Sequence, residues 1–215
     1  MKNSVMIRIF LLVISVVLFT AGCEKESGLP VDGDGNVYDT VVIGTQVWLK
    51  ENLKTTRYNN GVKIPLVTDN AQWASMTSAA YCWYNNNPVY KENYGALYNW
   101  YVVNTGLLCP VGWHVPTKEE WETLINYLGG GDIVYFKLRD SKFWPPSIYY
   151  NSNETGFSAR PSGERDRYGM FVGIGQCTSW WTSSRVSRVS FSHTCISITG
   201  MPAENGYSVR CIKNN

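Results

Sequence analysis

The chain has 215 residues, of which 44% are hydrophobic, and it carries 19 basic and 17 acidic side chains. This length is sufficient for one compact domain with a full core. The nearly balanced charge argues against a nucleic-acid-binding protein, because such a protein shows a basic excess concentrated on one face.

The chain opens with the pattern of an export signal. Lys2 and Arg8 come before an 11-residue apolar run (IFLLVISVVLF), which small residues and a cysteine follow. A membrane-spanning helix needs roughly 20 apolar residues, so this shorter run indicates a secretory signal peptide over residues 1–22. Cys23 directly after Ala-Gly resembles the lipobox of bacterial lipoproteins, although Thr20 stands where Leu is commoner. We therefore expect Cys23 to be lipidated and to anchor the mature protein to a membrane.

A short tether is expected between this lipid and the domain. Without residues 1–22 the chain keeps 193 residues with 17 basic and 17 acidic side chains, so no nucleic-acid partner is expected. Residues 23–36 are charged, contain Gly and Pro and lack apolar periodicity, which predicts a flexible tether. Their DGDGN sequence begins like a calcium loop. However, Val37 and Ile43 stand where an EF-hand needs Gly and Glu, so a turn is expected instead.

Residues 37–215 are expected to form one domain of short elements. Two β-rich runs flank Gly44 and predict a hairpin over residues 37–48. The aromatic stretch 95–103 (GALYNWYVV) predicts a buried helix. Further elements expected are a helix over 117–128, a short second helix within 132–140, and short strands over 141–215.

The helix over 117–128 has the clearest signals. Thr117 is its expected N-cap, and Glu120 three residues later completes a capping box. Two glycines follow the last helical residue. One apolar stripe marks the face that we expect to be buried, and it comprises Trp121, Leu124, Ile125 and Leu128.

Aromatic side chains dominate the composition. The chain has nine tryptophans and 14 tyrosines, and Leu and Ile are sparse for its length. Aromatic rings must therefore supply most of the core, which they can do while their polar tips reach a wet edge. These observations indicate a loop-rich α+β domain.

Six motifs, in the same order along residues 35–213, resemble the Fibrobacter succinogenes major paralogous domain, which occurs in many exported proteins of Bacteroidetes and Fibrobacteres. They are GNVYDTVVIGTQVWLKENLKTTRYNNG, YGALYNWY, LCPVGWHVPTKEEWETLINYLGG, ETGFSARPSG, SWWTSS and YSVRCIK. That domain in turn resembles the C-type-lectin-like fold of the formylglycine-generating enzymes, to which HVPTKEEWE and the SVR ending are similar. The resemblance implies a single loop-rich domain with two main helices, a small antiparallel sheet and an irregular ligand face.

Known catalytic and metal-binding patterns are missing from the sequence. Formylglycine-generating enzymes use a closely spaced cysteine pair, whereas Cys177 and Cys195 are 18 residues apart. His114 precedes a helix, where a packed or capping histidine is commoner than a catalytic one. His193 and Cys195 alternate on one strand and supply two metal ligands, which is too few for a site. The calcium triplets of lectins are also absent. We therefore expect no catalytic residue, cofactor or metal.

The resemblance also bears on the cysteines. In the family, a cysteine in the CPVGWH motif and one in the SVRC motif recur together, which implies a disulfide between Cys109 and Cys211. An exported protein permits such a bond. Cys82, Cys177 and Cys195 then form an odd set, and their spacing leaves open which one stays free.

Together these patterns favour a non-catalytic binding module for glycan or protein. We expect it on the cell surface, held to the outer membrane by its lipid. It would act alone or as an accessory subunit of an outer-membrane assembly such as a nutrient receptor. The alternative is an enzyme, either a degenerate oxidase of the formylglycine-generating type or a glycan hydrolase.

Two groups of side chains are candidates for the ligand face, because aromatic rings and arginine are enriched at binding hot spots. Neighbouring strand residues face opposite sides of a sheet, so one of two adjacent tryptophans belongs to the core on a purely structural interpretation. Lectin-like relatives carry the ligand on the stretch before the final strand, which favours the second group. The first group is Trp144, Tyr149 and Tyr150 with Arg165 and Arg167; the second is Trp180, Trp181, Arg185, Arg188 and Asn205, with the loop over 200–206.

Overall fold

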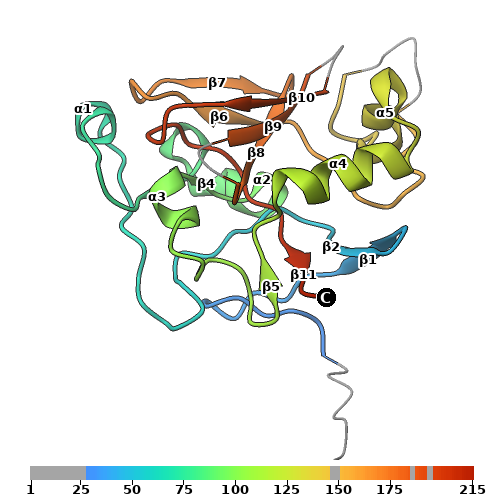
Figure 1. Cartoon of the computed structure of the whole chain (residues 1–215). Coiled ribbons are helices and arrows are strands. Elements are labelled where there is room, and N and C mark those ends of the chain that lie inside the picture. The colour runs from blue at the N-terminus through green and yellow to red at the C-terminus, as the bar shows by residue number, and fades with distance from the viewer. Residues whose placement is uncertain (1–27, 146–150, 185–186, 193–195) are drawn as a thin grey trace, which may run out of the picture.

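The computed structural model describes residues 28–145, 151–184, 187–192 and 196–215 (Figure 1). The expected signal peptide over 1–22 and the expected lipidation site Cys23 lie outside the described residues. The described chain is a mixed α+β structure with three sheets and short helices, which confirms the expected class. Within it, no helix combines the length and apolar character needed to cross a bilayer.

The first sheet joins the beginning, the middle and the end of the domain. The expected hairpin is confirmed: its two strands pair in antiparallel register from Thr40–Leu49 to Ile43–Gln46, and Gly44 at the turn has φ of +61°. The last strand, β11, pairs with both β2 and β5, so this sheet brings the beginning and the end of the domain side by side. Its order is β1 (Thr40–Ile43), β2 (Gln46–Leu49), β11 (Ile212–Lys213) and β5 (Trp113–His114).

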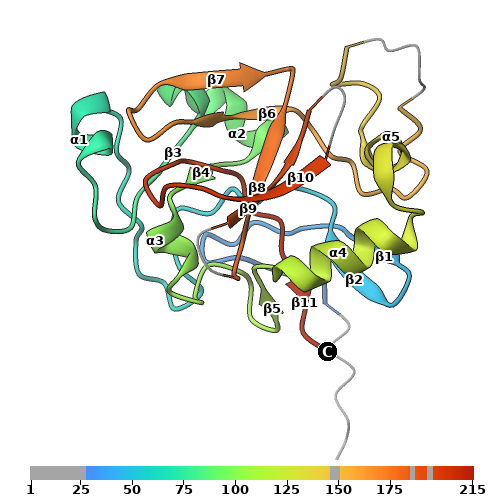
Figure 2. The same ribbon diagram turned by 45° about the horizontal axis from the view of Figure 1, so that its top comes forward.

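The second sheet has five strands and lies at the other end of the molecule from β5 and β11 (Figures 1 and 2). One pair, β6 with β8, is parallel and the others are antiparallel, so this sheet is mixed, whereas every pair of the first sheet is antiparallel. Its order is β10 (Ile196–Gly200), β9 (Ser187–Phe191), β8 (Thr178–Thr182), β6 (Ser162–Arg165) and β7 (Phe171–Ile174).

The stretch 95–103 is not one buried helix. Its first part forms strand β4 (Leu97–Tyr98), which pairs with β3 (Tyr81–Cys82), and its second part forms helix α3 (Trp100–Val103). Asn99 separates the two, because its side chain bonds the backbone of residues 78 and 80. These bonds reach backbone groups 19 and 21 positions earlier in the chain, and the extended backbone of Asn99 (φ −78°, ψ 165°) makes it the residue after which α3 begins.

The longest helix is α4 (Lys118–Tyr127), and its predicted capping box is present. Trp121 and Leu124 are buried, as the apolar stripe indicated. The short helix expected within 132–140 is α5 (Val134–Leu138). The other helical turns are α1 (Asn70–Ala74), α2 (Lys91–Tyr94), η1 (Tyr84–Asn86), η2 (Pro88–Tyr90) and η3 (Gly131–Ile133).

The core is aromatic, as expected from composition. Seven of the nine tryptophans are at most 8% exposed. Trp121 of α4 lies between Trp48 of β2 and Trp180 of β8, with ring centroids 4.7 and 5.4 Å away. Each large ring removes 150–250 Å² from water, so this tilted stack is what holds α4 against both sheets.

The chain is already packed at Pro30, which corrects the flexible tether that was expected to reach residue 36. Pro30 and Asp32 are buried. The Asp32 carboxylate accepts hydrogen bonds from the backbone N–H groups of Asp34 and Asn36, both at 3.0 Å, and from the Tyr38 hydroxyl at 2.6 Å. A carboxylate that accepts several local donors closes a tight turn. The turn predicted for the DGDGN sequence is therefore present, and it belongs to the domain.

Cys109 and Cys211 form a disulfide, as the resemblance implied. It joins the loop before β5 to the segment that enters β11. Cys82 and Cys177 carry free thiols, whereas Cys195 lies outside the described residues.

We predict that the double variant Cys109→Ser/Cys211→Ser loses about 4–5 kcal/mol of unfolding free energy, because a crosslink across about 100 residues restricts the unfolded chain. Urea titrations with and without reductant measure the loss. The double variant should not respond to reductant. A wild-type midpoint that is also unaffected by full reduction would contradict the prediction.

Candidate functional site

Three of the predicted ligand residues come together around Tyr207. The Trp181 ring lies 4.6 Å from the Tyr207 ring, the Arg188 guanidinium lies 5.0 Å from it, and Asn205 donates a 2.6 Å hydrogen bond to the Tyr207 hydroxyl. Residues from β8, β9 and the segment before β11 therefore meet at one place. The sequence grouping of Trp181, Arg188 and Asn205 matches this arrangement.

Two of these side chains are not on the surface, which corrects their expected role in contacting a ligand. Trp181 is fully buried and Asn205 is 5% exposed. Tyr207 covers Trp181, whose indole N–H donates to the Tyr98 carbonyl at 2.7 Å. Trp180 on the opposite face of β8 is also fully buried. Adjacent strand residues do face opposite sides here, but both faces of this strand are packed.

The first predicted group is also corrected where the structure describes it. Trp144 is 4% exposed, and its indole N–H donates to the Ala159 carbonyl. Arg165 is fully buried beneath Trp73 and bonds the Val67 carbonyl at 2.7 Å. Arg167 is exposed. Tyr149, Tyr150 and Arg185 lie outside the described residues, as do His193 and Cys195.

In the second predicted group, Arg188 is the member among the described residues whose side chain is partly exposed. Its side chain is 19% exposed and forms an ion pair with Glu164 of β6, which is 17% exposed. The guanidinium also donates to the Ser179 hydroxyl at 2.9 Å, and this hydroxyl donates to Glu164 at 2.9 Å. Glu164 was not predicted as a site residue, because nothing in its SGER motif indicates that β6 pairs with β8.

The register of the five-stranded sheet extends this polar group across three strands. Ser179 lies opposite Ser190, which lies opposite Ser197, and Arg188 lies opposite Thr199. Opposite residues share a face, so hydroxyl, guanidinium and carboxylate groups line one side of the sheet. Thr199 is exposed, and Ser190 and Ser197 are partly exposed. We call this the polar sheet face, and it comprises Glu164, Ser179, Arg188, Ser190, Ser197 and Thr199.

A second candidate surface is a groove of about 550 Å³ that sequence analysis did not predict. Arg57 and Lys63 meet there through an isolated bridge, and Tyr81 forms part of the wall. Asp34 accepts hydrogen bonds from the backbone N–H and hydroxyl of Thr56 and pairs with Arg57 at 3.2 Å. The volume is in the range of small-molecule sites. Lys63 is its exposed cation without an ion pair among the described residues.

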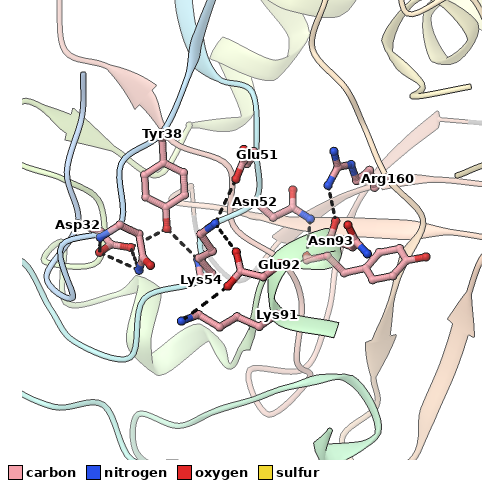
Figure 3. A network of polar contacts seen from close by, with 11 residues as sticks. Asp32, Tyr38, Glu51, Asn52, Lys54, Lys91, Glu92, Asn93 and Arg160 are labelled. Atoms are coloured by element: carbon pink, nitrogen blue, oxygen red, sulfur yellow. Dashed lines mark hydrogen bonds and ion pairs between the residues drawn. The ribbon is translucent and has the colours of Figure 1, made fainter. Parts of the chain in front are cut away.

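A third cluster of polar side chains, around Lys54, has a structural role. Figure 3 shows the Lys54 ammonium between two carboxylates, 2.8 Å from Glu92 and 3.5 Å from Glu51. Tyr38 donates to Asp32 and accepts from the Lys54 backbone N–H at 3.0 Å. The adjoining cavity has a volume of about 10 Å³, which is room for one water. These contacts fasten the N-terminal turn to α2 and leave no space for a ligand.

His114 and the two free cysteines of the described chain are each held in a defined environment. Both ring nitrogens of His114 are occupied, Nδ1 by Asn214 at 2.7 Å and Nε2 by Glu120 at 2.9 Å. Burial raises the pKa of Cys82 to about 12 and that of Cys177 to about 11. Among the described residues, no three His, Cys, Asp or Glu side chains group as metal ligands.

We predict that the folded protein protects the Cys177 thiol from alkylation. A pKa of about 11 instead of the ordinary 9.0 lowers the thiolate fraction at pH 8 by about 100-fold, and the thiolate is the reacting species. Timed iodoacetamide labelling, quantified by mass spectrometry on the peptide that holds Cys177, measures the rate. Labelling in urea should be as fast as for free cysteine. Equal rates in the folded and unfolded protein would disprove the protection.

Comparison with known proteins agrees with the motifs. A family model described as the Fibrobacter succinogenes major domain matches residues 41–213. No curated protein and no solved structure gives a significant match. The matched segment runs from β1 to β11 and contains the disulfide, the polar sheet face and most of the lining of the Arg57–Lys63 groove. The chain therefore belongs to the Fibrobacter succinogenes major domain family.

Proposed function

We propose that this protein is a non-catalytic binding module of the cell envelope, and that its polar sheet face contacts a glycan or protein ligand. The observation that carries the proposal is the network of Arg188, Glu164 and Ser179, in which the Arg188 and Glu164 side chains are partly exposed and the buried Ser179 hydroxyl bonds both of them. Hydroxyl, guanidinium and carboxylate groups fixed by one another can donate to and accept from sugar hydroxyls with little loss of side-chain entropy.

An exposed aromatic ring at the end of the same sheet supports a glycan or peptide ligand. Tyr168 lies in the turn between β6 and β7 and is 62% exposed. The Arg167 guanidinium lies 4.8 Å from its ring centroid and donates to its hydroxyl at 2.6 Å. A ring held in this way offers a rigid apolar contact beside polar groups, which is the composition typical of recognition surfaces.

Binding is favoured over turnover by the state of the reactive groups. The raised pKa values of Cys82 and Cys177 keep both thiols protonated near neutral pH. His114 is held on both nitrogens by Asn214 and Glu120. A nucleophile needs a free base or a depressed pKa, and these groups offer neither.

The proposal includes the lipid anchor at Cys23 and a location at the outer membrane, with the domain at the cell surface as a separate module or an accessory subunit of an outer-membrane assembly. It also retains the remote relation to the C-type-lectin-like fold. Support for that relation comes from α4, whose start is the HVPTKEEWE motif, and from the long irregular connections of the domain. Fold analogy by itself does not identify a ligand.

To test the ligand face, we predict that Thr199→Arg weakens binding at least 10-fold to a ligand captured on a glycan and peptide array. A long cation at this exposed position crowds the polar sheet face without removing a core contact. The matched control is Thr123→Arg on the exposed side of α4, which should bind as the wild type does. Both melting temperatures should stay within about 2 °C of the wild type, as for surface changes.

Turnover of the captured ligand would contradict the non-catalytic proposal. Unchanged affinity in Thr199→Arg would show that the ligand does not bind at the polar sheet face. Substitutions in the Arg57–Lys63 groove would then test that groove as the binding site.

For the anchor, we predict that Cys23→Ala leaves unprocessed or soluble protein that no longer partitions into detergent, because lipidation requires the cysteine. Phase separation and palmitate labelling of cells measure this. Cys82→Ala is a control that should still label. Incorporation of palmitate into Cys23→Ala would disprove the anchor.

A further inference from the structure

An exposed apolar patch lies at the end of the molecule that holds β5. Four aliphatic side chains there are about half exposed or more, namely Leu29 at 51%, Val31 at 49%, Val37 at 55% and Val111 at 76%. Single exposed aliphatic residues are ordinary, whereas a contiguous group indicates an interaction surface. We call Leu29, Val31, Val37, Val111 and Trp113 the basal patch.

The patch is continuous. Two grooves of about 140 and 240 Å³ share Leu29, Pro30 and Trp113 as lining residues, and Val111 lines the larger one. Val31 pairs with Val37 in an isolated antiparallel bridge, which brings these two side chains to the same place. The lining of the two grooves includes no carboxylate and one cation, Lys213. An apolar surface edged by a lysine suits the interface of a lipid bilayer.

The length of the chain before the patch limits what can cover it. Gly28, where the described chain begins, lines both grooves. Four residues separate it from Cys23, and the five Cα-to-Cα steps from Cys23 to Gly28 span at most about 17 Å when the chain is fully extended. A lipid on Cys23 would therefore hold the basal patch within about 17 Å of the membrane surface.

From these observations we propose that the basal patch rests on the bilayer interface, with Trp113 at the level of the lipid headgroups. The inference rests on the proposed lipid anchor. Trp113 is partly buried, and tryptophan is enriched at membrane interfaces because its ring is apolar and its N–H is polar. The five-stranded sheet lies at the opposite end of the molecule (Figures 1 and 2). This orientation holds the five-stranded sheet away from the bilayer.

The experiment uses the lipidated protein in phosphatidylcholine vesicles whose acyl chains carry bromine near the headgroup, which quenches nearby tryptophan fluorescence. Seven of the nine tryptophans are buried, so the partly exposed Trp113 and Trp100 are the informative ones. We expect lower emission in brominated than in unbrominated vesicles. Trp113→Phe should abolish this difference. The matched control Trp100→Phe, on α3, should keep it.

Mass spectrometry of the N-terminal peptide in the same sample distinguishes failure of the membrane contact from failure of the lipid anchor. If Cys23 carries acyl chains and bromine has no effect, or the effect survives in Trp113→Phe, the membrane contact is overturned while the anchor stands. If Cys23 carries no acyl chain, the anchor fails and the membrane contact fails with it. A second copy on the patch would make the soluble Cys23→Ser protein dimeric and the lipidated protein insensitive to bromine, which also overturns the proposal.

Discussion

The fold depends on buried arginines that bind backbone carbonyls of loops. Arg210 is 1% exposed, and its guanidinium donates to the Leu49 carbonyl at 3.1 Å and to the Phe157 carbonyl at 2.7 Å. The Asn52 side-chain oxygen accepts from the same guanidinium and from the Trp180 indole. Loop carbonyls have no ladder partner, and leaving them unpaired in a core costs about 1–3 kcal/mol each. One planar group with five donors satisfies several at once. Burial lowers the pKa of Arg210 to about 9, so the charge persists at neutral pH.

The same solution recurs at two other places, which explains how a chain with so little regular structure has a packed interior. Arg165 donates to the carbonyls of Val67, Thr68 and Gly169, and Arg139 donates to the Ser192 carbonyl. Among the described residues, no carboxylate lies within ion-pair distance of these two arginines or of Arg210. Aromatic rings contact these charges in place of carboxylates. The Arg139 guanidinium lies 4.1 Å from the centroid of the Trp144 ring, and the Arg165 guanidinium lies 4.3 Å from that of the Trp73 ring. The abundant aromatic side chains thus serve as core and as partners for buried charge.

This double use of aromatic rings is the reason that only some of the candidate ligand residues lie at the surface. Arginine and tryptophan near one another are typical of binding surfaces, and the sequence offers no sign that separates such a surface from a buried stack. Arg188 lies at the surface, whereas Trp181 is covered by Tyr207 from a segment 26 residues later in the chain. Glu164 comes to Arg188 through the pairing of β6 with β8 and β8 with β9. The order of strands in a sheet depends on contacts between distant segments. The alternation of apolar and polar residues within one strand does not predict which strand pairs with it.

By itself, the amino-acid sequence determined the elements whose signals are local: the hairpin at Gly44, the capped helix that begins after Thr117, and the turn closed by Asp32. The family motifs added the Cys109–Cys211 pair. Only the tertiary structure decided that residues 95–103 divide into a strand and a helix, that the tether is packed from Pro30, and which polar groups share a sheet face. Local signals suffice where a residue bonds within a few positions along the chain. The remaining features depend on buried carbonyls and rings that find partners far away in sequence, and many arrangements of an aromatic, loop-rich chain satisfy the same local pattern.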